Sequence, residues 1–254
     1  MTSPEHYERG GAGARTLEQM DAARRYNRWI VERLRPGIGK RVLEVGSGTG
    51  TLTALLEDRE LLVGVEVVPE FVDELRRRYA GRPSMRFELV DISAGTQGLA
   101  GHRFDSAVSA NVFEHIPDDQ AAMEAVFKLL EPGGTFALLV PAHRWLLGAL
   151  DRSIGHFRRY SKAELRARLV RAGFEVESLR YSNPVGALGW LVNVKLLGRT
   201  KLGGVGLFDR LVPALERLDT LTDWPFGLQL VAIARKPRKR AGSSSRRTPR
   251  TRPT

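Results

Sequence analysis

The segment Val42-Leu43-Glu44-Val45-Gly46-Ser47-Gly48-Thr49-Gly50 carries the strongest structural signal in the chain. Its apolar first half is typical of a buried strand, and the glycines that follow indicate a tight turn that opens a helix near residue 51. Glycine lets the backbone approach a ligand closely. The spacing is G-x-G-x-G, with Thr51 where the dinucleotide fingerprint needs glycine and Glu44 two residues before the first glycine. Both features disfavour a nicotinamide-dinucleotide site.

Short apolar segments alternate with amphipathic segments over much of the remaining chain. This alternation predicts an open α/β sheet of seven strands, mostly parallel with the last strand antiparallel, and helices on both faces. Ser161 and Glu164 form a predicted capping box at the start of one helix. The expected strands are 41–45, 61–66, 85–90, 104–109, 135–140, 174–181 and 228–235, and the expected helices are 16–35, 50–58, 70–80, 118–130 and 161–172.

The glycine loop and four later segments together resemble the class I S-adenosylmethionine (SAM)-dependent methyltransferases, over about residues 38–181 and 228–235. The later segments are Glu66 at a strand end, Asp91-Ile92, Asn111-Val112-Phe113-Glu114-His115-Ile116-Pro117 and Leu130-Glu131-Pro132-Gly133-Gly134. The resemblance implies a Rossmann-like fold, SAM as the cofactor, and an acid at position 66 on the ribose hydroxyls. The cofactor-binding residues that it implies are Glu44, Gly46, Ser47, Gly48, Gly50, Glu66, Val67, Asp91, Ile92 and Asn111.

Three histidines are candidate general bases, because transfer to oxygen or nitrogen also removes a proton from the acceptor. They are His115, His143 and His156. His115 could equally pack as a structural residue. The segment Gly155-His156-Phe157-Arg158-Arg159-Tyr160 resembles a motif of a small-molecule subset of these enzymes. Arg158, Arg159 and Tyr160 are therefore candidate substrate-binding residues, with a salt-bridged loop as the alternative.

We divide the chain into an N-terminal helical cap (1–37), a methyltransferase domain (38–235) and a basic tail (236–254). Within the domain, 141–160 is a predicted substrate loop and 182–222 a helical, apolar insertion. The insertion could cover an apolar acceptor, pack on the sheet, or dip into a membrane interface beside a lipid-linked substrate. The expected reaction is methyl transfer to a small-molecule, sugar or lipid-linked acceptor.

The net charge of +11 comes mostly from the end of the chain. Nine basic residues and no acid lie in 235–254, which leaves 31 basic and 29 acidic residues in 1–234. We expect this tail to be disordered, and because it would attract any polyanion it is weak support for a nucleic-acid substrate. A nucleic-acid methyltransferase and a SAM-binding protein without catalysis remain the alternatives.

Several absences limit the chemistry further. The chain has no cysteine, which excludes a Cys nucleophile, a thiolate zinc site and an iron–sulfur cluster. No spaced His/Asp cluster is apparent, so we expect no metal. No secretion signal or long apolar run is apparent either, so we expect a cytoplasmic protein.

Overall fold

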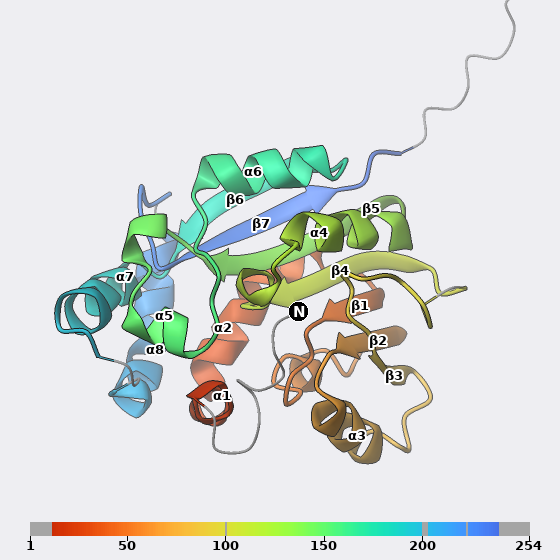
Figure 1. Ribbon diagram of the computed structural model, residues 1–254, viewed down its shortest axis with the longest axis horizontal. Helices are drawn as coiled ribbons and strands as arrows, with labels where there is room; N and C mark the ends of the chain where they lie inside the picture. Colours follow the sequence, from red (N-terminus) through yellow and green to blue (C-terminus); the bar gives the residue numbers. More distant parts are fainter. Residues whose placement is uncertain (1–11, 100, 200–202, 222, 239–254) are drawn as a thin grey trace, which may run out of the picture.

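A computed structural model describes residues 12–99, 101–199, 203–221 and 223–238 (Figure 1). Seven strands form one sheet in the order β3-β2-β1-β4-β5-β7-β6. Six strands run in one direction, and β7 runs antiparallel to its neighbours β5 and β6, which confirms the predicted sheet. The strands are β1 (Arg41–Val45), β2 (Leu61–Glu66), β3 (Met85–Leu89), β4 (Phe104–Ala110), β5 (Leu130–Pro141), β6 (Glu175–Ser182) and β7 (Gln229–Arg235).

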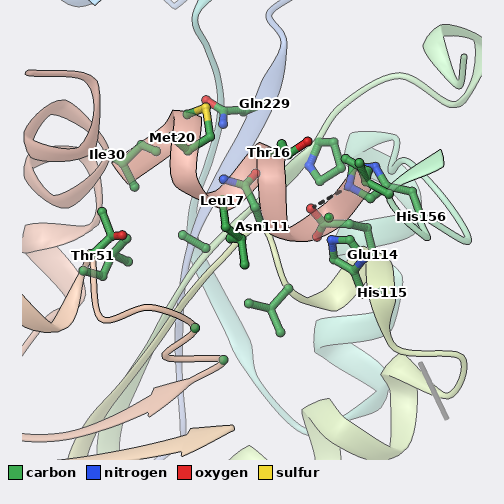
Figure 2. Close-up of a pocket in the computed structure, with 18 of the residues that line it drawn as sticks. Thr16, Leu17, Met20, Ile30, Thr51, Asn111, Glu114, His115, His156 and Gln229 are labelled. Atoms are coloured by element: carbon green, nitrogen blue, oxygen red, sulfur yellow. Dashed lines mark ion pairs between the residues drawn. The ribbon is translucent and has the colours of Figure 1, made fainter. Parts of the chain in front are cut away.

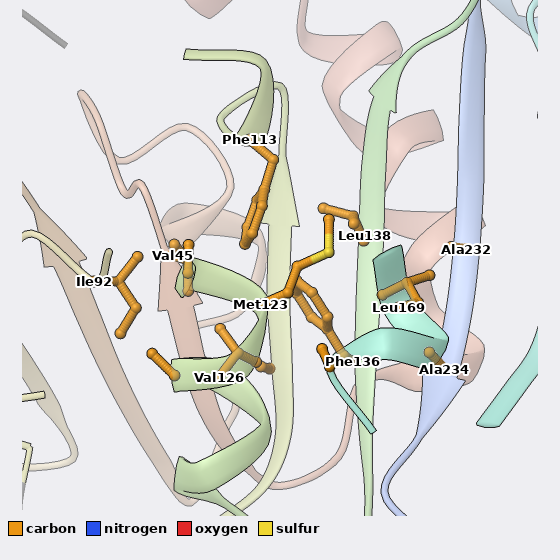
Figure 3. Packing of buried hydrophobic residues seen from close by; sticks show 14 of the residues in the cluster. Val45, Ile92, Phe113, Met123, Val126, Phe136, Leu138, Leu169, Ala232 and Ala234 are labelled. Carbon is orange, nitrogen blue, oxygen red and sulfur yellow. The ribbon is translucent and has the colours of Figure 1, made fainter. Parts of the chain in front are cut away.

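Two helical layers cover the sheet because alternate side chains of each strand point to opposite faces. Leu43 and Val45 of β1 pack beneath α4 and α6, whereas Val42 packs beneath α2, α3 and α8 on the other face. Figure 3 shows the first face, where Phe113, Met123 and other apolar side chains fill the space between α4 and the strands. The helices are α1 (Ala12–Asp21), α2 (Arg24–Leu34), α3 (Pro69–Arg78), α4 (Asp119–Leu129), α5 (Ala149–Ser153), α6 (Lys162–Arg171), α7 (Pro184–Trp190) and α8 (Val205–Thr220).

The helix predicted over 50–58 is wrong. The structure has turns there and a single 3-10 turn, Thr53–Leu55. The hydroxyls of Thr49 and Thr51 donate to Asp21, and the hydroxyl of Thr53 donates to Glu44. Threonine side chains that bond locally or to neighbouring segments compete with regular helix, and two of these threonines lie within 50–58 while the third directly precedes it.

Two other boundaries differ from the prediction. The helix expected over 16–35 is two helices, α1 and α2, which meet at Ala22 and Ala23. β5 begins at Leu130, which pairs with Phe104 of β4, although the Pro-Gly-Gly sequence was predicted to precede the strand. The register shifts across this sequence, and pairing with β4 resumes at Thr135. The capping box of α6 is confirmed, with the Glu164 amide donating to Ser161 Oγ at 3.2 Å and the Ser161 amide donating to Glu164 Oε2 at 3.1 Å.

The insertion before β7 contains α7, a π-helical turn (Leu191–Leu196) and α8. In the described part of the chain, no helix is both long and apolar enough to cross a bilayer. Most of the predicted disordered tail, 239–254, lies outside the described residues, as does segment 1–11 of the N-terminal cap.

Candidate active site

The glycine loop after β1 lies at the carboxyl edge of the sheet. Gly46 and Gly48 both have positive φ angles, 77° and 52°. A Cβ atom on Gly46 would lie 2.4 Å from Cγ2 of Val112, so a side chain does not fit there. A Cβ atom on Gly48 would meet nothing within 4 Å, because this residue borders a cavity. The loop therefore presents backbone atoms without a side chain to the cavity, so a ligand can approach the backbone closely.

Glu66 at the end of β2 fixes the position of this loop. Its Oε2 accepts a hydrogen bond from the Gly48 amide at 2.8 Å, and its Oε1 accepts from the amides of Val67 at 2.7 Å and Val68 at 3.1 Å. Burial raises the pKa of Glu66, and these amide donors offset part of that effect. A carboxylate offers about four lone pairs, so capacity remains here for a hydroxyl of a ligand.

A cavity of about 550 Å³ begins at the glycine loop and continues toward the insertion. Glu66 lines it beside the loop, and Trp190 and Phe208 line it from the insertion. Eight of the ten predicted cofactor-binding residues border this cavity: Gly46, Ser47, Gly48, Glu66, Val67, Asp91, Ile92 and Asn111.

Glu114, His115 and His156 meet on the cavity wall (Figure 2). One ligating atom from each of them lies within 4.8 Å of the others. Glu114 is fully buried, and neither of its carboxylate oxygens accepts a hydrogen bond from any described residue. Burial raises the pKa of Glu114 to about 7, and the nearby charge of His156 offsets part of that rise.

Asp151 supports this cluster from behind. Its Oδ1 lies 2.8 Å from Nδ1 of His156 and accepts from Nε of Arg159 at 2.9 Å, while the Gly148 amide donates to Oδ2 at 2.7 Å. Burial alone would raise the pKa of Asp151, but the hydrogen bonds and charges of His156 and Arg159 bring it below its ordinary value. Asp151 is therefore a carboxylate that orients the His156 ring.

A family model described as a methyltransferase domain matches residues 17–179. The chain belongs to the class I SAM-dependent methyltransferase family. The chain is 28% identical over 158 residues to an uncharacterized methyltransferase of Mycobacterium bovis, covering 62% of this chain and 60% of the relative. It is 30% identical over 168 residues to a ubiquinone biosynthesis O-methyltransferase of Xanthomonas axonopodis, covering 59% and 69%. The chain thus spans about three fifths of the length of the first of these relatives.

Solved structures of methyltransferases share the fold. A SAM-dependent methyltransferase from Thermotoga maritima aligns with a TM-score of 0.64 at 16% identity, covering 91% of this chain and 98% of the other. The N-methyltransferase NodS from Bradyrhizobium japonicum, in complex with S-adenosylhomocysteine, aligns with a TM-score of 0.54 at 18% identity, covering 84% and 86%.

Two predicted cofactor-binding residues of this methyltransferase, Glu44 and Gly50, do not border the cavity. Glu44 is 1% exposed and lies beneath the loop, where Oε2 accepts from the hydroxyls of Thr53 at 2.6 Å and Ser47 at 3.0 Å. Burial raises the pKa of Glu44 to about 7, despite these two hydroxyl donors. The position of Glu44 does not fit the predicted direct contact with a cofactor: its side chain supports the glycine loop from beneath.

Arg158 and Tyr160, predicted to bind substrate, are not among the residues that line the cavity. The Tyr160 hydroxyl donates to Asp119 Oδ2 at 2.7 Å, and Nη1 of Arg158 lies 2.7 Å from Asp119 Oδ1. Asp119 is 1% exposed, so its charge is compensated within the fold. Of the three substrate candidates only Arg159 borders the cavity, and its guanidinium is held by Asp151. The salt-bridged loop is the reading that fits these contacts.

His143 also lies outside the residues that line the cavity. Its ring stacks on Tyr181 at 4.8 Å, and the Gly227 amide donates to its Nε2 at 3.5 Å. Burial and the charge of Arg159 lower the pKa of His143. The other two candidate bases, His115 and His156, are brought together with Glu114 by segments far apart in the sequence. No spaced motif in the sequence indicates this cluster, because the fold alone brings its members together.

Sequence reasoning missed the contribution of α1. Thr16, Leu17 and Met20 line the cavity, and Asp21 at the end of α1 accepts a hydrogen bond from the hydroxyl of Thr49 in the glycine loop at 2.9 Å (Figure 2). The amphipathic pattern of this helix showed a buried face but could not show that a cavity lies against it.

Replacing Glu66 by alanine should weaken binding of S-adenosylhomocysteine at least about tenfold, because the loop loses its acceptor and the ligand loses a charged hydrogen-bond partner. Isothermal titration calorimetry measures the effect. Glu70→Ala, an exposed acid in the first turn of α3, is the matched control and should bind normally. Normal binding by Glu66→Ala would refute the assignment of the cofactor site.

Replacing Glu44 by glutamine should flatten the pH dependence of stability. Because the pKa of Glu44 is raised in the folded chain, its stabilising contribution is fully present below pH 4.5. This contribution is lost as the pH rises through about 7. Glutamine keeps the accepting oxygen but does not ionise, so above this range the variant should gain about 3 kcal/mol relative to the native chain. Urea unfolding at several pH values measures this difference. The control is Glu60→Gln, which replaces an exposed acid paired with Lys40 and should show the same pH dependence of stability as the native chain. If Glu44→Gln also showed the native pH dependence, the prediction would be contradicted.

Proposed function

We propose that the chain transfers the methyl group of SAM to an oxygen or nitrogen atom of a small, largely apolar molecule. The observation that carries this proposal is one continuous cavity with three chemically distinct regions. The glycine loop and Glu66 form the cofactor region, and Glu114, His115 and His156 form a polar cluster. Apolar side chains of the insertion and of the neighbouring helices form the third region, which includes Leu150, Ile154, Val185, Trp190, Val194, Val205 and Phe208.

The residues of the first region fit SAM. Glu66 offers a carboxylate edge for a ribose diol, and Gly48 leaves open space above the loop backbone. Asp91 and Ile92 border the cavity next to this edge, where the resemblance expects the adenine ring. SAM, when bound, supplies an activated methyl group on a sulfonium, and the chain supplies alignment with the acceptor.

The apolar region favours a hydrophobic acceptor. Trp190 and Phe208 both face the cavity, and Tyr26 meets Phe208 edge-on at 5.5 Å. Ligand pockets of this kind use apolar walls for affinity and a few polar groups for orientation. Two ubiquinone biosynthesis O-methyltransferases are among the relatives, which supports an aromatic, quinone-like acceptor class.

The polar cluster provides the place where the acceptor loses its proton. His115 and His156 meet with ring centroids 4.5 Å apart, and His156 is oriented by Asp151. An acceptor hydroxyl or amine placed between these groups and the cofactor region would be activated there. We therefore assign the catalytic role to the cluster and give none to His143.

The outer face of the insertion supports delivery of the acceptor from an anionic phospholipid bilayer. Leu188, Val192 and Leu196 recur every four residues and are 48% to 69% exposed. No acidic residue occurs in 184–208, whereas Lys195, Arg199 and Lys201 do. An apolar stripe with basic neighbours suits an anionic membrane surface. The same segment lines the cavity on its inner side through Trp190 and Val194.

A methyl-transfer screen tests the proposed function. The full chain is incubated with SAM labelled on its methyl group and with a lysate separated into lipid, water-soluble small-molecule and RNA fractions. We expect label in the lipid or small-molecule fraction, and its loss in the Glu66→Ala variant. Label that enters RNA alone, or none in any fraction, would overturn the proposal.

Co-sedimentation with vesicles tests the membrane surface. The native chain should bind phosphatidylglycerol-containing vesicles, and the double variant Leu188→Asp, Leu196→Asp should bind at least about tenfold more weakly, because the two charges face the bilayer. Leu89→Asp, Val170→Asp is the matched control, since both side chains are similarly exposed elsewhere on the surface. Equal binding by both double variants would assign the affinity to the basic tail and refute this surface.

A further inference from the structure

The polar cluster contains a buried carboxyl group whose oxygens have no hydrogen-bond partner among the described residues. Glu114 is 0% exposed, and no described residue donates a hydrogen bond to either of its oxygens. A buried carboxylate without a donor or a cation is strongly destabilising, so an orphan of this kind calls for a specific explanation. The group nearest to Oε1 is Nε2 of His156, at 3.8 Å.

Asp151 fixes which ring nitrogen of His156 lies toward Glu114. Nδ1 of His156 lies 2.8 Å from Oδ1 of Asp151, which leaves Nε2 as the ring nitrogen on the side of Glu114. Nε2 and the Glu114 carboxylate thus face each other. Their separation of 3.8 Å is too long for a hydrogen bond. It does allow both atoms to bind one ion at about 2.1 Å each.

We propose that Glu114, His115 and His156 bind a divalent transition-metal ion. Two imidazoles and one carboxylate are a donor set that suits Zn²⁺ and Fe²⁺, and the three ligating atoms already lie within 4.8 Å of one another. Asp151 accepts from the far nitrogen of His156, as a carboxylate behind a metal-bound histidine does.

The position of the site gives the ion a role. All three residues line the cavity, so an acceptor atom can complete the coordination. For this role the inference rests on the proposed function: the ion would bind the acceptor oxygen and lower the pKa of its hydroxyl. The hydroxyl proton would leave to solvent, and the electron pair of the acceptor oxygen would form the new O–CH3 bond. The S–CH3 bond of SAM would break at the same time, and its electron pair would stay on the sulfur of the departing S-adenosylhomocysteine.

Metal titration of the full chain tests the site without any acceptor. After treatment with a chelator, the chain is titrated with Co²⁺ followed by visible absorption, and then with Zn²⁺ followed by calorimetry. We expect one ion per chain. Glu114→Gln and His156→Ala should each weaken binding at least about tenfold, and Asp151→Asn should weaken it about ten- to a hundredfold.

The control is His102→Ala, which removes the same side chain from outside the cavity and should leave binding unchanged. Binding of S-adenosylhomocysteine by each variant shows that it is folded. The metal site would be overturned if the chain bound no ion stoichiometrically, or if Glu114→Gln and His156→Ala left binding unchanged. The remaining explanation would then be a proton shared by Glu114 and His156. If the chain binds the ion but transfers no methyl group, the proposed function is refuted and the metal site is not.

Discussion

The contact between the Glu66 carboxylate and the Gly48 amide holds the functional edge of the molecule together. It links the loop after β1 to the end of β2, and it is possible because the parallel register places Val45 beside Val65. The glycines let the loop turn back within reach of that carboxylate. The same register leaves both strand ends open to one cavity, so the cofactor region is a direct consequence of sheet geometry.

Three glutamates at this edge differ in their hydrogen-bond donors. Backbone amides donate to Glu66, and threonine and serine hydroxyls donate to Glu44. Glu114 receives no hydrogen bond from the described residues, although its burial is the most complete of the three. The first two glutamates build the loop, because their partners belong to it. Glu114 borders the cavity, and its oxygens lack hydrogen-bond donors there. This distinguishes a carboxyl group available to a ligand from one that stabilises the fold.

Local patterns in the sequence predicted most of the sheet and the cofactor edge. The apolar runs and glycine positions predict strands and turns because they reflect backbone requirements of a few neighbouring residues. The helix over 50–58 was mispredicted because Thr49, Thr51 and Thr53 bond to Asp21 and Glu44, and such partners are not visible in a local pattern. The cluster of Glu114 with His156 escaped prediction for the same reason. It depends on how the loop before α6 crosses the end of β4.

The insertion is connected to the chemistry through Arg159. The guanidinium of Arg159 lies over the Trp190 ring at 4.4 Å, and it also pairs with Asp151, the residue that orients His156. Trp190 in turn donates to the carbonyl of Leu146 at 3.3 Å. A shift of α7 would therefore move the cation that fixes Asp151, and with it the ring of His156. The arginine–tryptophan pair and the arginine–aspartate pair therefore connect the segment that carries the exposed apolar stripe to the polar cluster.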